Sequence, residues 1–134
     1  MFGLLQILYI TEKFKDFSKE MFNHSLDKVH HFPLACLYLN FSMISIEALR
    51  EGDLIDSCNR NRSVIMTMNE FFTGCVFYFF FQYKSEEKSI VDIGRMIQEM
   101  NPYMKENVCH MLNIHRNEQS KLLEKGCISM NEHN

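Results

Sequence analysis

Six histidines are the side chains in this chain most able to bind a metal, and their spacing decides whether they can. A zinc site on a helix needs two histidines four residues apart and a third ligand close by. His110 and His115 are five residues apart, which places them about 140° apart around a helix. His30 and His31 are adjacent, and neighbouring side chains point apart in most backbone conformations. We therefore expect no metal site and no cofactor.

Motifs for nucleophilic catalysis and phosphate binding are also missing. The sequence has no Gly-x-Ser-x-Gly segment, which would place a nucleophilic serine on a sharp turn. Its glycines are isolated, so no glycine-rich loop is present to bind phosphate through backbone N–H groups. The sequence therefore predicts no catalytic residue in this chain.

The five cysteines indicate the compartment rather than a reaction. They are odd in number, widely spaced and without a Cys-x-x-Cys pair, and Cys36 and Cys75 lie in apolar runs. Secreted disulfide frameworks have a different pattern, whereas free thiols suit a reducing compartment. We expect a cytoplasmic protein.

Arg60 and Arg62 form a small basic cluster in the segment Asn59-Arg60-Asn61-Arg62. The net charge of the whole chain is -3, so no overall attraction to nucleic acid is expected. The plainest interpretation of the cluster is a solvated turn. The alternative is a partner contact, and Arg60 and Arg62 are then the candidate partner-binding residues.

Helices must position these residues, because the chain has only 5 Gly and 2 Pro and lacks the alternation of apolar and polar residues typical of strands. We predict an all-α, single-domain helical bundle of about six helices. A domain over residues 1–117 is followed by a polar C-terminal tail, residues 118–134. The predicted helices cover residues 2–10, 14–22, 33–51, 64–83 and 89–100, and a sixth begins at Asn101-Pro102.

Local signals mark several ends of these helices. Pro33 suits the first turn of the third helix, and Gly52 is placed to end it in a left-handed conformation. Ser63 or Asn61 can cap the fourth helix, and Ser89 can cap the fifth.

Residues 71–81 read Phe-Phe-Thr-Gly-Cys-Val-Phe-Tyr-Phe-Phe-Phe and could be mistaken for a membrane span. A spanning helix needs about 20 apolar residues, roughly twice this length. Extending the run brings in Glu70 on one side and Lys84 on the other. We therefore predict a central helix covered by its neighbours, and no membrane span.

Residues 30–42, His-His-Phe-Pro-Leu-Ala-Cys-Leu-Tyr-Leu-Asn-Phe-Ser, resemble a signature segment of the ELMO domain, in which an apolar helix carries Asn-x-Ser or Asn-x-Thr. Residues 46–54 and 58–60 continue the resemblance, and residues 1–10 resemble the first core helix of that family. For Asn40 and Ser42 we expect structural roles. The Ser42 hydroxyl can bond back to the carbonyl of Tyr38, and the Asn40 amide can hold a neighbouring loop.

The resemblance implies a regulator of ARF- and ARL-class small GTPases. Members of this kind activate GTP hydrolysis through an arginine in an Asp-Phe/Leu-Arg-Gly segment, which in this numbering would lie upstream of Met1. An arginine presented in trans is worth about 10³ to 10⁵ in rate. We therefore expect an N-terminally truncated ELMO-like interaction domain that contacts such a GTPase and activates it weakly or not at all.

Two alternatives stay open at this stage. One is a GTPase-activating protein in a full-length form that carries the arginine. The sequence therefore leaves open whether the protein activates GTP hydrolysis. The other is a non-catalytic structural adaptor. We also expect self-association through exposed apolar helix faces, because missing upstream helices would uncover residues 2–10.

Overall fold

The computed structural model describes residues 2–26, 34–85 and 90–132, and within these ranges the chain is an all-α bundle with seven helices. The prediction of an all-α fold is confirmed, and the helix count is close to the predicted six. The helices are α1 (Phe2–Lys13), α2 (Lys15–Ser25), α3 (Leu34–Arg50), α4 (Ile55–Asn61), α5 (Val64–Ser85), α6 (Ile90–Glu106) and α7 (Val108–Glu132).

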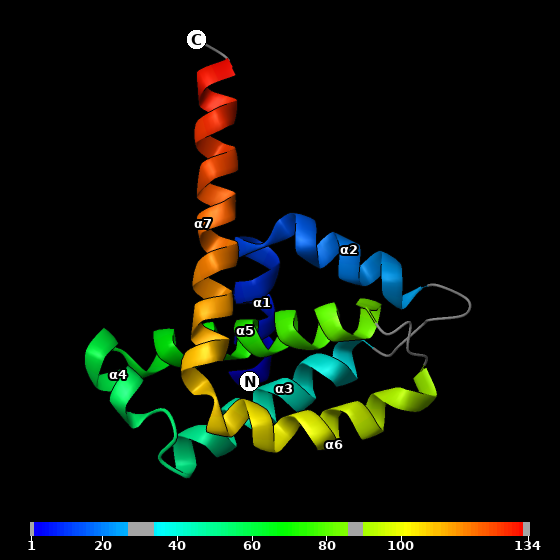
Figure 1. Ribbon diagram of the computed structural model, residues 1–134, viewed down its shortest axis with the longest axis vertical. Coiled ribbons are helices and arrows are strands. Elements are labelled where there is room, and N and C mark those ends of the chain that lie inside the picture. Colours follow the sequence, from blue (N-terminus) through cyan, green and yellow to red (C-terminus); the bar gives the residue numbers. More distant parts are fainter. Residues whose placement is uncertain (1, 27–33, 86–89, 133–134) are drawn as a thin grey trace.

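Helix α5 is the centre of the bundle (Figure 1). It packs mainly against α7 and α3 and also contacts α1, α4 and α6. The ring of Phe17 in α2 lies 4.0 Å from that of Phe77 in α5, so every other helix touches this one. The predicted buried central helix is confirmed, since all residues from Phe71 to Phe77 are buried.

The length and apolar composition of α5 would also allow it to cross a membrane. The core helix of a soluble protein can have the same length and apolar composition, and most of α5 is buried inside the bundle. Among the described helices it is the one candidate, and the signal is weak.

The seam between α5 and α7 depends on one glycine. A Cβ atom added to Gly74 would lie 2.1 Å from the backbone oxygen of Met111. Only a residue without a side chain lets the two helix backbones approach this closely. Gly74 thereby brings α7 against the most aromatic part of α5.

Two predicted helix ends are confirmed. Gly52 has a left-handed φ of 88°, and the N–H of Asp53 donates to the carbonyl of Ala48 over 2.9 Å, which closes the end of α3. At the start of α5 the N–H of Met66 donates to the Ser63 hydroxyl over 3.2 Å. The predicted starts at Pro33 and Ser89 lie outside the described residues.

The predicted helix start at Asn101-Pro102 is wrong, because Pro102 lies inside α6. The helix instead ends at Glu106, and α7 begins after the single turn residue Asn107. The Asn107 side-chain amide donates to the carbonyl of Tyr103 over 2.8 Å, and the backbone N–H of Asn107 donates to the same carbonyl over 2.9 Å. From this break α7 runs across α5, and its C-terminal half extends away from the other helices (Figure 1). Helix α7 therefore continues past residue 117, where the sequence placed the end of the domain. That domain boundary stays a prediction.

The helix beyond the predicted six is α4, which lies between the predicted third and fourth helices. It is only 7 residues long and contacts α5. Its burial of Ser57 and Cys58, rather than large apolar side chains, explains why no apolar stripe revealed it.

Helix α1 has one buried face and one exposed apolar face. Leu4 is 63% exposed, and Leu5 and Leu8 are also exposed, whereas Gln6 and Ile10 are buried. The polar Gln6 is buried because its amide donates to the Ser45 hydroxyl over 3.2 Å. One face of α1 therefore packs and the other is an exposed apolar surface.

Asn40 is exposed, and its predicted hold on a neighbouring loop stays a prediction. Ser42 is buried, and its backbone carbonyl accepts a hydrogen bond from the Ser45 hydroxyl over 2.7 Å. Buried polar contacts in α3 thus centre on Ser45, one turn beyond the Asn-x-Ser segment.

Candidate functional site

A polar pocket of about 400 Å³ lies where α4, α5 and α7 meet. We call it the arginine pocket, because it contains the guanidinium groups of Arg60 from α4 and Arg116 from α7. Its lining consists of Ser57, Arg60, Asn61, Glu70, Cys109, Leu112, Asn113 and Arg116. The consecutive helices α4 and α5 and the distant helix α7 therefore contribute to one polar hollow.

The structure separates the two arginines that the sequence marked as candidate partner contacts. Arg60 lines the arginine pocket and donates a hydrogen bond of 3.4 Å to the Ser57 hydroxyl, one turn earlier in α4. Arg62 is exposed and lies outside the lining, at the C-terminal end of α4. Its φ of 55° places it in the left-handed region, where a residue with a side chain is strained. Within the described ranges neither arginine forms an ion pair with a carboxylate.

Glu70 is the one carboxylate in the lining of the arginine pocket. The Asn61 amide donates to Glu70 Oε2 over 3.4 Å and to the Thr67 hydroxyl over 3.0 Å, which ties the end of α4 to α5. Burial raises the pKa of Glu70, and the nearby Arg116 charge and the Asn61 hydrogen bond oppose that rise. With Glu70 ionised, the pocket holds two guanidinium groups against one carboxylate and favours an acidic partner.

Arg116 and Asn113 were missed by the sequence reasoning. Arg116 donates a hydrogen bond of 3.5 Å to Asn113, one turn earlier on α7. Both residues lie more than fifty positions after Arg60, and no motif links the two segments. The only sequence signal for this part of the pocket was the spacing of residues 109, 113 and 116, which places them one turn apart on one side of a helix.

His115 precedes Arg116 in the sequence but belongs to the core. Its ring is buried, and its edge meets the ring of Phe14 with centroids 5.7 Å apart. The Nε2 atom lies 3.1 Å from the Tyr9 hydroxyl. Burial, assisted by the Arg116 charge, lowers the pKa of His115 to about 4. The ring is therefore neutral at pH 7, and its role is in packing.

Comparisons with known proteins match the region that contributes α4 and α5 to this pocket, and the family match ends before α7. The ELMO/CED-12 family model matches residues 1–97, which include Arg60, Arg62 and Glu70. ELMO domain-containing protein 3 of Mus musculus and that of Homo sapiens are each 29% identical over 112 residues, or 82% of this chain. The protein of that name from Bos taurus is 27% identical over the same length. The chain spans about 29% of the length of these relatives.

No solved structure matches the chain at a significant level. The family assignment therefore rests on sequence. Because the family model covers most of the 134 residues, the chain belongs to the ELMO/CED-12 family.

Proposed function

We propose that this chain is an interaction domain that contacts a small GTPase of the ARF/ARL class through the arginine pocket, and that these 134 residues activate GTP hydrolysis weakly or not at all. Membership of the ELMO/CED-12 family supports a regulatory role in general. The observation that carries the proposal further is the arginine pocket itself, in which Arg60 faces solvent without a carboxylate partner among the described residues.

The charge of the pocket supports an acidic partner surface. The chain as a whole has a net charge of -3, so a pocket with two guanidinium groups is a local exception. Arginine presents a rigid set of N–H donors that match carboxylates, and it is enriched among residues that dominate binding energy. The hydrogen bond from Arg60 to Ser57 is long and lies within one helix, so a partner can replace it at little cost.

Weak activation follows from the arginines that these residues contain. The resemblance to ARF/ARL activators implies an arginine in an Asp-Phe/Leu-Arg-Gly segment, and no such segment occurs in the 134 residues. Arg116 is on α7 beside Glu70, and Arg60 is in the short helix α4. Neither position corresponds to that segment, so binding and activation are separate properties in this proposal.

The contact is tested by titrating the chain against ARF- and ARL-class GTPases loaded with GDP or with a non-hydrolysable GTP analogue. The Arg60→Gln, Arg62→Gly double variant should bind about tenfold more weakly, as expected when a central arginine is lost. The wild-type affinity should also fall as salt rises from low to physiological concentration. Arg95→Gln, an exposed arginine on α6 outside the pocket, is the matched control and should bind normally.

Two results would oppose this proposal. Unchanged affinity in the double variant would remove the arginine pocket from the contact. Absence of binding to every GTPase would favour the structural adaptor. We further propose that the chain is cytoplasmic, for which the support is its five widely spaced cysteines without a Cys-x-x-Cys pair.

A further inference from the structure

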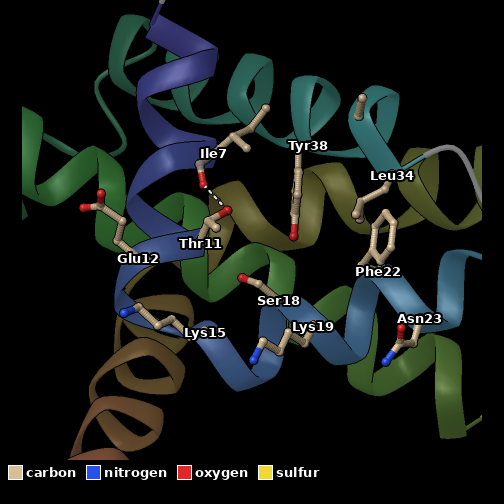
Figure 2. A pocket seen from close by; sticks show the side chains of 11 residues that line it. Ile7, Thr11, Glu12, Lys15, Ser18, Lys19, Phe22, Asn23, Leu34 and Tyr38 are labelled. Carbon is tan, nitrogen blue, oxygen red and sulfur yellow. Dashed lines mark hydrogen bonds between the residues drawn. The ribbon is translucent and has the colours of Figure 1, made fainter.

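A second hollow is largely apolar and shares no lining residue with the arginine pocket. We call it the α1–α2–α3 groove, because these three helices line it, and its volume is about 740 Å³ (Figure 2). Ile7 of α1, Phe22 of α2, and Leu34 and Tyr38 of α3 supply its large apolar surfaces.

The floor of this groove has few polar atoms that require a partner. The Thr11 hydroxyl donates to the carbonyl of Ile7 over 2.8 Å (Figure 2), and the Ser18 hydroxyl donates to that of Ile10 over 3.2 Å. The Tyr38 hydroxyl donates to the sulfur atom of Met21 over 3.6 Å. Because the hydroxyl groups are used within the protein, an apolar ligand would leave none of them unpaired.

One end of the groove is apolar and includes Phe22, Leu34 and Tyr38. Phe22 is 54% exposed, although its place on the apolar side of an amphipathic helix indicated burial. In Figure 2 the side chains of Phe22 and Leu34 lie together beside Tyr38. Covering such a surface with hydrocarbon is favourable, and each methylene group that becomes fully buried strengthens binding about fourfold.

The other edge of the groove is cationic. Lys15 and Lys19 are four residues apart on α2 and therefore lie on the same side of that helix, as Figure 2 shows. Both are exposed, and in the described parts of the chain neither forms an ion pair. Glu12 of α1 lies on this edge too, so the edge carries two positive charges and one negative charge.

We propose that the α1–α2–α3 groove binds a single-chain anionic amphiphile, specifically a free long-chain carboxylate. The carboxylate lies at Lys15 and Lys19, and the hydrocarbon chain lies along Ile7 and Tyr38 towards Phe22 and Leu34. Charge complementarity with the lysine edge selects the headgroup, and the apolar floor accepts the chain. This site is separate from the arginine pocket, so it does not depend on the GTPase contact.

The binding test uses 11-(dansylamino)undecanoate as a fluorescent probe and measures its displacement below the micelle concentration of each competitor. Dodecanoate should displace the probe, and decanoate and octanoate should do so with affinities that fall by up to about fourfold per methylene group. Dodecyltrimethylammonium has the same chain with the opposite charge and should compete poorly. Equal competition by the cationic amphiphile, or no displacement by dodecanoate, would overturn the proposal.

Variants assign the probe to the groove. Lys15→Gln and Lys19→Gln should each weaken dodecanoate binding about two- to fivefold, as expected for one exposed ion pair. Glu12→Gln should strengthen it, because the like charge on the edge is removed. Lys121→Gln on α7, an exposed lysine outside the groove, is the control and should have no effect.

A bulky residue provides an independent check. Ala35 lines the groove and is exposed, so Ala35→Trp should fill the space and abolish displacement while the thermal melt stays cooperative. Unchanged dodecanoate binding in this folded variant would overturn the proposal. Should the variant fail to fold, the opposite shifts expected for Glu12→Gln and the two lysine variants decide the matter. The Arg60→Gln, Arg62→Gly variant should bind dodecanoate normally, which separates this site from the proposed GTPase contact.

Discussion

Helix α7 takes part in two regions that are held together by different forces. On one side its backbone at Met111 lies against Gly74, and His115 is buried beside Phe14. On the other side Asn113 and Arg116 line the arginine pocket. The α5–α7 seam permits no added atom, whereas the arginine pocket contains hydrogen bonds of 3.4 to 3.5 Å and exposed charged groups.

The difference indicates which region carries stability and which is available for binding. Close packing in the seam contributes through shape and apolar burial, so small changes there are costly. Exposed charges in the pocket contribute little to folding, because water screens them and competes for their hydrogen bonds. Substitutions in the seam should therefore change the free energy of unfolding, and substitutions in the pocket should change partner affinity.

Gly74→Ala should have the largest effect on folding. The new Cβ atom would overlap the Met111 backbone, and backbone atoms cannot move aside as the end of a flexible side chain can. We expect the free energy of unfolding to fall by about 3 kcal/mol or more. Urea unfolding followed by circular dichroism measures the loss.

Gly94→Ala is the matched control for that substitution. Gly94 lies in α6, and a Cβ atom there would have no neighbour within 4 Å. Alanine favours a helix over glycine by about 1 kcal/mol, so this variant should be more stable than the wild type. If Gly74→Ala raised the free energy of unfolding as much as Gly94→Ala does, the seam would not be closely packed.

The buried histidine makes the seam sensitive to acid. Folding lowers the His115 pKa from 6.5 to about 4, so the unfolded chain binds a proton more readily than the folded one. The resulting stabilisation is present above pH 6.5 and is lost as the pH falls towards 4. We expect a loss of about 2 to 3 kcal/mol by pH 4.5 from this group.

His115→Gln isolates this contribution, because the other titrating groups are common to both proteins. Unfolding free energies at pH 7 and pH 4.5 should differ less in the variant than in the wild type. An identical pH dependence in both would mean that His115 is already accessible to protons in the folded protein.

Arg62→Gly should have the smallest effect on stability, and in the opposite direction. Glycine accepts the left-handed conformation at φ 55° without strain, but it loses more backbone entropy on folding. The two effects nearly cancel, so we expect a gain of less than about 1 kcal/mol in a thermal melt. A loss comparable to that of Gly74→Ala would show that the pocket end of α4 also supports the fold.

Much of the bundle could be predicted because its signals are local. The aromatic run at residues 71–81 indicated a buried central helix, and Gly52 and Ser63 marked helix ends through their own backbone preferences. The start at Asn101-Pro102 failed for a physical reason. Proline is tolerated within α6, and the helix ends only at Glu106, four residues later.

The sites could be predicted only in part, because they are made by contacts between distant segments. Arg60 and Arg62 stood out as a local charge cluster, but Arg116 joins Arg60 only through the packing of α7 on α5. Likewise, Phe22 has the position of a core residue in α2, and its exposure depends on where α1 and α3 lie. Neither hollow is a property of any one segment.

The most direct test of the account is single-turnover GTP hydrolysis by an ARF- or ARL-class GTPase that binds the chain, measured with the chain at saturating concentration. We predict that the GTPase is bound and that its hydrolysis rate changes by less than about tenfold. Acceleration on the order of 10³ or more, the scale of an arginine supplied in trans, would contradict the proposed separation of binding from activation.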